Sequence, residues 1–328
     1  MLRVLVTGIT GFAGSHLAEQ LVSTGDEVHG LAHEDPPFAH LVAIQDRVRI
    51  HAGDITRLDD VRSAIAASQP DAVVHLAGQA VPTLASADPI AAVRVNVLGT
   101  SALLTALEER PRTRLIIASS ADVYGAPERI PVDEDAPLRP ANVYAATKVA
   151  AEALTREFGA RHGAPVVILR AANQNGPRQH PGLAASAFAK QIAEAEVGIT
   201  EPVVRHGRLD AERDFLDVRD MARAYVAALA LDESGTFNVG TGRAVAIAEI
   251  LDTLIGLARI PVRAELDPGR VRGGDPTRLA LDVTRFRQRT GWSPRIGLVD
   301  SLRDTLDYWR AAIPKHAGVG GQSPPRSW

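Results

Sequence analysis

Short apolar runs alternate with longer segments of helical periodicity through the first half of the chain. Runs rich in Val, Ile and Leu predict strands at residues 2–7, 27–31, 48–51, 72–76, 114–119 and 166–170. The intervening segments carry apolar residues three and four positions apart, as at Leu17, Leu21 and Val22, which predicts helices. Strands that alternate with helices favour a doubly wound parallel sheet with right-handed crossovers, so we expect an α/β fold.

The alternation loosens after about residue 170. Helical periodicity continues at residues 182–197, 218–231, 247–258 and 299–310, with short strand-like pieces at 202–205, 236–239 and 262–266. We therefore predict a sheet domain over residues 1–170, to which 207–240 return in part, and a smaller, mixed α/β substrate-binding lobe over 171–312. Residues 313–328 are rich in Gly, Pro and Ser without periodicity, which predicts a disordered tail.

Composition excludes several kinds of protein. Lys and Arg number 36 against 39 Asp and Glu, for a net charge of −3, which gives no electrostatic reason to expect nucleic acid or an anionic membrane as partner. Cysteine is absent, so disulfides, thiolate nucleophiles and Cys-ligated metals are excluded, and we expect no metal site. The apolar start is too short for a signal peptide and no apolar run approaches the roughly 18 residues of a membrane span, so we expect a soluble, cytoplasmic protein.

Three glycines follow the first predicted strand at a spacing of three residues. They stand between that strand and a predicted helix that begins near Phe12. Such glycines allow a tight turn, approach of the backbone to a pyrophosphate and close packing of helix on strand, while the helix N-terminus offers free N–H groups to an anion. We therefore expect a Rossmann-type domain whose turn contacts a dinucleotide through Gly8, Thr10, Gly11, Phe12, Ala13 and Gly14.

The end of the second predicted strand bears on which dinucleotide binds. An acid at this place holds the ribose hydroxyl of NAD, and here Ala32 replaces it. This favours NADP(H) over NAD(H), with His33 as the expected contact of the 2′-phosphate. Glu34 and the lack of an arginine at this place argue for NAD, so both cofactors stay open.

Two further strand ends are expected near the cofactor. Asp54 and Ile55 follow the third strand, which would place a carboxylate beside the adenine amino group; Asp54 could instead cap the helix that follows. Leu76, Ala77 and Gly78 follow the fourth strand, so their backbone is expected beside a ribose of the cofactor.

A tyrosine, a lysine and a serine form a candidate catalytic group. Tyr144 and Lys148 stand four residues apart in a segment predicted to be helical, so phenol and ammonium share one face. A fixed ammonium, together with an oxidised nicotinamide, favours the phenolate and moves the pKa of the phenol toward the working range of an acid–base catalyst. Ser120 follows the fifth strand, where ligands of such sheets bind, so its hydroxyl could hold a substrate carbonyl. Lys148 also stands out because Lys190 and Lys315 are the only other lysines in the chain.

These residues resemble the extended short-chain dehydrogenases/reductases, a family of nucleotide-sugar epimerases, dehydratases and reductases. The sequence matches T-G-x-x-G-F-x-G in the glycine turn, S-S-x-x-V-Y-G after the fifth strand and Y-x-x-x-K, in this order. The resemblance implies that Ser120 and Tyr144 bracket the reacting C4 oxygen and that Lys148 holds the nicotinamide ribose. It also implies a homodimer in which helices near 88–110 and 144–161 form a four-helix bundle.

The second half is similar to the members of the family that act on GDP-mannose derivatives. R-x-x-N-x-x-G-P at 170–177, the segment 211–220 and D-P-x-R-x-R-x-x-D at 267–275 carry this similarity. It implies a GDP-sugar substrate whose diphosphate contacts Asn173, Lys190, Arg213 and Arg272 and whose nucleotide ribose contacts Asp275. Two of these residues have plainer alternatives, because Arg213 could pair with Asp214 or Asp217 and Lys190 could be a solvated helix lysine.

The residues after Ser120 bear on the reaction. Dehydratases of this family use acid–base groups immediately after the active-site Thr or Ser, whereas here Ala121 can transfer no proton and Asp122 is shorter than the usual glutamate. We therefore expect a reductase of the C4 keto group of GDP-4-keto-6-deoxy-D-mannose, with Tyr144 as proton donor and Asp122 among the substrate contacts. A GDP-mannose 4,6-dehydratase, an NDP-sugar 4-epimerase and a non-catalytic NADP-binding sensor remain the alternatives.

Overall fold

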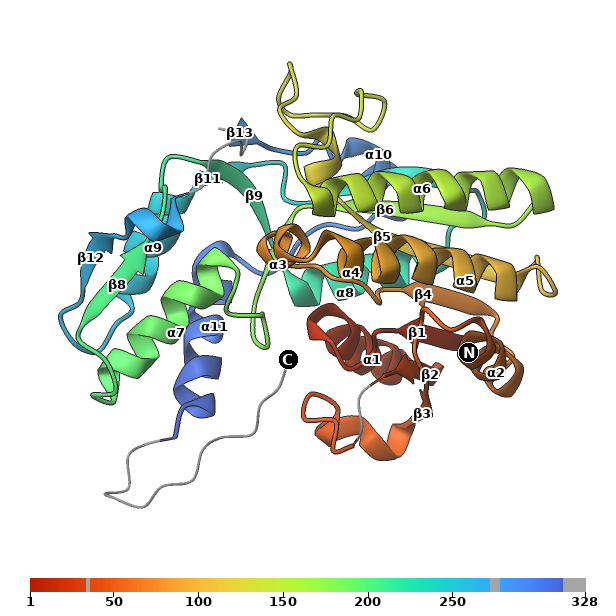
Figure 1. Ribbon diagram of the computed structural model, residues 1–328, viewed down its shortest axis with the longest axis horizontal. Coiled ribbons are helices and arrows are strands. Elements are labelled where there is room, and N and C mark those ends of the chain that lie inside the picture. The colour runs from red at the N-terminus through yellow and green to blue at the C-terminus, as the bar shows by residue number, and fades with distance from the viewer. Residues whose placement is uncertain (34–35, 272–277, 315–328) are drawn as a thin grey trace.

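The computed structural model describes residues 1–33, 36–271 and 278–314. In Figure 1 a central sheet with helices on both faces lies beside a smaller lobe of mixed helices and strands. This arrangement confirms the α/β fold that the sequence predicts.

The main sheet has seven strands, all parallel, in the order β10-β6-β5-β4-β1-β2-β3. Its strands are β1 (Arg3–Thr7), β2 (Glu27–Ala32), β3 (Val48–Ala52), β4 (Ala72–His75), β5 (Arg114–Ser120), β6 (Val166–Ala171) and β10 (Gly235–Val239). All six strands predicted in the first half are present, and the strand predicted at 236–239 returns from the second half to pair with β6. The strand order reverses between β1 and β4, and the carboxyl ends of strands form a ligand crevice at such a point.

Helices cover both faces of this sheet and bury two apolar clusters. On one face lie α1 (Phe12–Thr24), α8 (Val218–Leu229) and α10 (Thr284–Thr290), and on the other α2 (Leu58–Ser68), α5 (Gly99–Leu107) and α6 (Val143–His162). Leu17 and Leu21 of α1 and Tyr225 of α8 are buried in the first cluster because their helical spacing puts them toward the strands. Two short 3-10 helices, η1 (Val42–Arg47) and η3 (Ala121–Tyr124), lie in the connections.

The smaller lobe has an apolar core of its own, which contains Phe188, Ile250 and Leu306. Its elements are β7 (Asn173–Asn175), α7 (Ala184–Glu196), β8 (Val203–His206), β9 (Glu212–Asp217), β11 (Ala244–Ala246), α9 (Ile247–Gly256), β12 (Arg263–Leu266), η4 (Pro268–Arg270), β13 (Arg278–Leu279) and α11 (Leu298–Ala312). β9 pairs antiparallel with β11 and parallel with β7 and β13, while β8 and β12 form a separate parallel pair. These elements frame the space between the two parts of the molecule.

The helix expected over 88–110 is interrupted in the structure. After the short α3 (Pro82–Ala87), the chain forms α4 (Pro89–Val93), a π turn η2 (Arg94–Leu98) and then α5. By length and hydropathy Pro89–Leu107 could cross a membrane, but Leu103 and Leu107 are fully buried in the second apolar cluster, as in a core helix. π turns are frequent at functional sites, and this one turns Asn96 into the protein.

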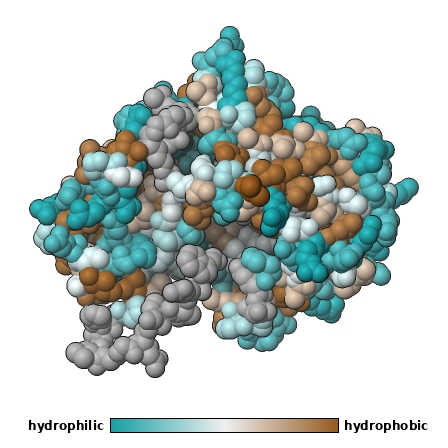
Figure 2. Space-filling view, in the orientation of Figure 1, coloured by the Kyte–Doolittle hydropathy of each residue, from teal (hydrophilic) through white to brown (hydrophobic). Residues whose placement is uncertain are grey.

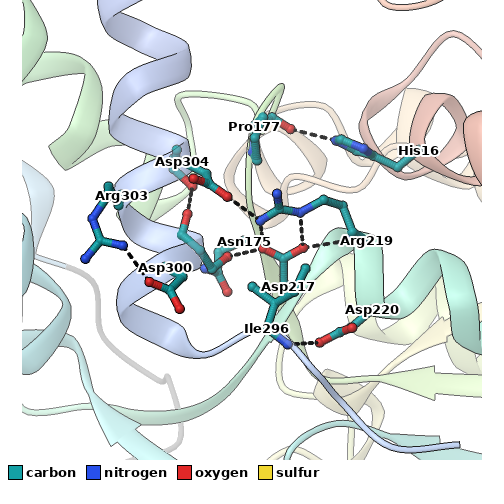
Figure 3. Close-up of polar contacts among 12 residues, drawn as sticks. His16, Asn175, Pro177, Asp217, Arg219, Asp220, Ile296, Asp300, Arg303 and Asp304 are labelled. Atoms are coloured by element: carbon teal, nitrogen blue, oxygen red, sulfur yellow. Dashed lines mark hydrogen bonds and ion pairs between the residues drawn. The ribbon is translucent and has the colours of Figure 1, made fainter.

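A buried aspartate ties the C-terminal helix to the rest of the smaller lobe (Figure 3). Asp217 caps α8 by accepting the N–H of Arg219 at 2.8 Å, and it also accepts the hydroxyl of Ser301 on α11. Ser301 in turn accepts from the Asn175 amide on β7 at 2.6 Å, and the Arg219 guanidinium lies 2.7 Å from Asp304 on α11. Because all these groups bind one another, α11 is fixed against β7 and the start of α8.

Two neighbouring aspartates hold other late segments of the chain. Asp214 accepts the backbone N–H groups of Thr241 and Gly242 at 2.9 Å each, which fixes the turn before β11. Asp220, fully buried on α8, accepts the N–H groups of residues 295 and 296 at 2.8 and 2.9 Å and pairs with Arg223. The acids of segment 211–220 therefore have structural partners far along the chain.

A loop after β7 connects the two parts of the molecule through α1. The carbonyl of Pro177 lies 3.1 Å from His16 Nε2 on α1 (Figure 3). Arg178 follows with a φ of +73° and donates to the Ser15 hydroxyl at 3.1 Å and to Glu19 at 2.5 Å. The helix that begins at the glycine turn is thereby held by the segment that leads into the smaller lobe.

We expect Asp220→Ala to lower the free energy of unfolding by about 3 kcal/mol, because it leaves two backbone N–H groups and Arg223 without their buried acceptor. Asp300→Ala is the matched control, since Asp300 pairs with Arg303 on the exposed side of α11 and its loss should cost at most about 0.5 kcal/mol. Urea unfolding of both variants measures the difference. Equal stability of the two variants would contradict this account of Asp220.

Candidate active site

The glycine turn fits the backbone geometry that a dinucleotide needs. A Cβ on Gly8, whose φ is +70°, would lie 2.8 Å from Ala77 N, and a Cβ on Gly14 would lie 2.1 Å from the Gly8 oxygen. Both positions therefore require glycine for α1 to pack on β1 and β4. Gly11 caps α1 without a side-chain hydrogen bond, so the first N–H groups of the helix, near Phe12 and Ala13, are positioned for an anionic pyrophosphate.

Thr7, the first residue of the glycine-turn motif but not among the predicted contacts, joins β1 to β4 at this turn. Thr7 Oγ1 accepts from the N–H groups of Leu76 and Ala77, each at 3.2 Å, and lies 2.7 Å from His75 Nδ1. Burial and then the charge of Lys148 lower the pKa of His75 to about 3, so its imidazole is neutral. Uncharged hydrogen bonds therefore join the ends of β1 and β4, where the strand order reverses. A polar residue at the end of a buried run was the available signal.

Asp54, the acid predicted to contact adenine, has local hydrogen-bond partners in the structure. Asp54 Oδ1 accepts the N–H and hydroxyl of Thr56 at 2.8 and 2.9 Å, and these bonds, the backbone one first, lower the pKa of Asp54. His33 also adds to this lowering, while Ala32 is buried at the end of β2. Ile55 packs under Gly99, and Glu34 lies outside the described residues. A contact of Asp54 with adenine remains a prediction.

Ser120, Tyr144 and Lys148 come together at the carboxyl end of β5. Asn142 caps α6 by accepting the N–H of Ala145 at 2.8 Å, which places Tyr144 in the first turn of the helix. The hydroxyls of Tyr144 and Ser120 are hydrogen-bonded. Lys148 Nζ lies 5.8 Å from the centre of the Tyr144 ring and donates to the Ala118 carbonyl at 2.9 Å. The structure thus brings the three predicted catalytic residues into one group.

The electrostatics of this group favour a protonated phenol and a charged amine at neutral pH. Burial, together with the Asp122 carboxylate, raises the pKa of Tyr144 well above its usual value, and the bond from Ser120 opposes this only in part. Burial lowers the pKa of Lys148 to about 8, and the negative charge of Glu152 limits that fall. Tyr144 is therefore prepared to donate a proton, and Lys148 is an ammonium beside it.

Asn96 is a further residue of the site that the sequence pattern did not single out. From the π turn, its amide donates to Thr147 on α6 at 2.9 Å and exchanges hydrogen bonds with the backbone of Gln79. A Cβ on Gly78 would lie 2.9 Å from Asn96 Oδ1 and 3.7 Å from Lys148 Nζ, so the backbone approaches both closely. Asn96 therefore holds the segment after β4 against the catalytic helix. A polar residue inside an apolar helix was the only signal in the sequence.

A cleft of about 420 Å³ lies between the smaller lobe and residues that neighbour the catalytic group in the chain, among them Asp122 and Asn142. Three predicted substrate contacts, Asp122, Asn173 and Arg213, line it. Four basic residues that were not predicted line it as well: Arg205, His206, Arg208 and Arg270. The cluster R-H-G-R at 205–208 could have indicated the first three, but its position in one cleft with Asp122 depends on how the smaller lobe folds over the sheet.

The other predicted contacts are not placed at this cleft. Lys190 on α7 is hydrogen-bonded to Glu194 and lies 5.8 Å from the Trp309 ring, and it is not among the lining residues. Arg272 and Asp275 lie outside the described residues. Asp214 and Asp217, the alternative partners considered for Arg213, bind the turn before β11 and helix α11. Within 1–33, 36–271 and 278–314, no group of three or more His, Asp or Glu side chains could hold a metal ion.

Comparison with known proteins agrees with the geometry of the site. The family model described as GDP-mannose 4,6 dehydratase matches residues 5–305. A GDP-6-deoxy-D-mannose reductase of Pseudomonas aeruginosa is 34% identical over 315 residues, covering 95% of this chain and 98% of the relative.

Two solved structures extend this similarity to three dimensions. RMD from Pseudomonas aeruginosa, complexed with NADPH, has a TM-score of 0.82 at 31% identity and covers 95% of this chain and 100% of its own. The UDP-glucose 4-epimerase of Thermus thermophilus, in complex with NAD, has a TM-score of 0.84 at 31% identity, with 94% and 99% covered. The chain belongs to the GDP-mannose 4,6 dehydratase family, among the extended short-chain dehydrogenases/reductases that convert nucleotide sugars with NAD or NADP.

Proposed function

We propose that the protein reduces the C4 keto group of GDP-4-keto-6-deoxy-D-mannose with NADPH. The observation that carries this proposal is the placement of Tyr144 beside Ser120 and Lys148, in a site where Ala121 follows Ser120. Ala121 is buried and has no group that could remove a proton from C5, as dehydration requires. The similarity to a GDP-6-deoxy-D-mannose reductase supports the same substrate.

Reduction needs a hydride at C4 and a proton at the carbonyl oxygen. NADPH, when bound along the glycine turn, supplies the hydride. Tyr144 Oη donates its proton to the C4 oxygen as the carbonyl double bond opens, and Ser120 donates a hydrogen bond to the same oxygen. The Lys148 ammonium stabilises the phenolate that is left, which takes up a proton from solvent.

The basic residues of the cleft suit a diphosphate between nucleoside and sugar. Arg213 is buried on β9, Arg205 lies on β8, Arg208 follows that strand and Arg270 lies on η4. One guanidinium group can bind two oxygens of a phosphate at once. Several arginines can therefore neutralise the two negative charges of a diphosphate in a narrow cleft. Asn173 adds an amide at the mouth of the same cleft.

A dehydratase is the second candidate, because of the name of the family model and because Asp122 lies close to Tyr144. Water loss from GDP-mannose needs a base for the C5 proton, and Asp122 would be that base. An epimerase would retain NAD and exchange two sugars without net oxidation. A sensor without catalysis would have no use for a phenol and ammonium arranged in this way.

We expect the purified protein to oxidise NADPH with GDP-4-keto-6-deoxy-D-mannose and Tyr144→Phe to lower kcat by about 10²- to 10⁴-fold, because the proton donor is lost. The affinity for NADPH should change less than about threefold, since the ring remains. Tyr308→Phe, in half-buried surroundings on α11, is the control and should retain full activity.

Other outcomes would assign the alternatives. Water loss from GDP-mannose without added reductant would indicate the dehydratase, and interconversion of two sugars with retained NAD would indicate the epimerase. Undiminished turnover by Tyr144→Phe would remove Tyr144 from the mechanism.

For the cofactor we propose a preference for NADPH over NADH. Ala32 leaves the ribose 2′ position without a carboxylate, and exposed His33, beside Asp54, lies at the end of the same strand. The NADPH in the Pseudomonas aeruginosa structure supports this choice, whereas the NAD of the epimerase is the alternative.

We expect His33→Ala to weaken NADPH binding about fivefold and to leave NADH binding unchanged, because a hydrogen bond from an exposed side chain to a phosphate contributes about 1 kcal/mol. Fluorescence titration with each cofactor measures both constants. An equal loss for the two cofactors would exclude a role for His33 in recognising the 2′-phosphate.

We also propose a soluble, cytoplasmic homodimer formed through α4, α5 and α6. In Figure 2 hydrophobic residues gather on the face that these helices present in this view. Ile90 is 74% exposed and Leu98 55%, and Val93 and Leu84 add to the same surface. Apolar side chains this exposed on adjacent helices are typical of a surface that packs against another copy.

We expect Ile90→Glu with Leu98→Glu to convert the dimer to a monomer, since four buried carboxylates would face one another across the two-fold interface. Size-exclusion chromatography with light scattering measures the mass. Val299→Glu, a similar change at an exposed position on α11, is the control. A wild-type protein that is already monomeric would refute the proposed dimer.

A further inference from the structure

Glu152 is a fully buried acid on the catalytic helix to which the chemistry described above gives no role. It lies one helical turn after Lys148 on α6 and is 0% exposed. Its carboxylate accepts the hydroxyl of Ser119, the residue before Ser120. It also accepts from Arg170 on β6, through Nε at 3.0 Å and Nη2 at 2.8 Å, and from Arg156 at 2.5 Å.

The partners of Glu152 extend to the remaining elements of the site. Arg170 Nη1 donates to the Tyr124 hydroxyl at 2.9 Å, and its guanidinium lies 4.9 Å from the Tyr124 ring. Tyr124, two residues after Asp122 on η3, donates to Asn238 on β10 at 2.7 Å. One acid therefore connects β5, β6, η3 and β10 to the helix that carries Tyr144 and Lys148.

Among the groups around Lys148, Glu152 is the acid whose negative charge stabilises the ammonium form of Lys148. His75 faces it from β4 and is neutral, and Ser119 and Ser120 on β5 contribute only hydroxyls. Asp122 on η3 lies beside Tyr144, whose pKa it raises, while Arg170 on β6 is paired with Glu152 itself. Burial would raise the pKa of Glu152, but Arg170 and Ser119 hold it below its usual value, so the carboxylate is ionised.

We propose that Glu152 is a positioning residue of this site, whose buried carboxylate keeps Lys148 charged and holds the end of β5 that presents Ser120. This proposal rests on the proposed role of Lys148 in the reaction. A buried amine loses its proton more easily than a solvated one, and a fixed negative charge one turn away opposes that loss. Lys148 then remains an ammonium up to about pH 8, where its pKa lies.

The rarity of lysine allows the charge of Lys148 to be measured directly. Lysine labelled with ¹³C at Cε gives only three signals, from Lys148, Lys190 and Lys315, in the ligand-free full chain. Loss of one signal in Lys148→Arg assigns it, and the other two lysines serve as internal references. The titration of Lys148 is followed by NMR between pH 6 and 11.

Two substitutions should move this titration in opposite directions. Glu152→Gln keeps the shape and removes the negative charge, so the midpoint of Lys148 should fall by about one pH unit. Arg156→Gln removes a half-exposed cation that partly neutralises Glu152, so the midpoint should rise by a few tenths of a unit. Glu157→Gln, which changes an exposed acid paired with Arg161 on the same helix, should leave the midpoint unchanged.

In the NADPH-dependent reaction, the pH at which kcat/KM falls on the alkaline side should be lower for Glu152→Gln and higher for Arg156→Gln than for the wild type. A folded Glu152→Gln whose Lys148 titrates as in the wild type would overturn the proposal, as would a Lys148 that titrates with the two other lysines. If Glu152→Gln does not fold, Arg156→Gln decides, and an unchanged midpoint there overturns it. Because the NMR titration needs no sugar, a protein inactive on the 4-keto sugar would refute the proposed function while the charge of Lys148 is still tested.

Discussion

The crowding of β1, β4 and α1 at the glycine turn is the constraint on which the rest of the site depends. A Cβ at Gly14 would lie 2.1 Å from the Gly8 oxygen, so helix and strand touch through bare backbone. This contact fixes the axis of α1 and therefore the direction of its N-terminal N–H groups. Thr7 adds the end of β4 to the same junction, which places Gly78 beside Lys148. Cofactor turn and catalytic group are thus parts of one packed unit.

The smaller lobe is attached to this unit at a few defined points. Pro177 and Arg178 contact α1, and Asp217 connects β9 and α8 to the C-terminal helix. Arg178 adopts a positive φ, which costs a non-glycine residue about 1 kcal/mol or more and requires compensation from its bonds to Ser15 and Glu19. The position of the segment that carries Asn173 therefore depends on the position of α1. The proposed substrate contact at Asn173 and the proposed cofactor turn are therefore joined by backbone that is only a few residues long.

Whether a feature could be predicted from the sequence depends on how far apart in the chain its interacting residues lie. The glycine turn and the Tyr144–Lys148 pair depend on spacing within one turn or one helix, so their pattern is local. Asn96 and Arg208 belong to the site only because distant segments fold against it, and neither has a local signal strong enough to predict this. Lys190 stood out in the sequence because the chain has few lysines and many arginines. In the structure it contacts Glu194 and Trp309 and does not line the cleft.

The protonation of Tyr144 bears on which of the family's reactions the site favours. Dehydration and epimerisation begin by oxidising an alcohol at C4, for which the tyrosine must first act as a base. Reduction of a ketone begins with the tyrosine as an acid. Burial and the nearby Asp122 carboxylate both stabilise the neutral phenol, while Lys148, kept charged by Glu152, limits the cost of the phenolate that forms later. An acid at position 122 thus favours reduction twice, since it opposes the basic form of Tyr144 and stands where a dehydratase would place a longer glutamate.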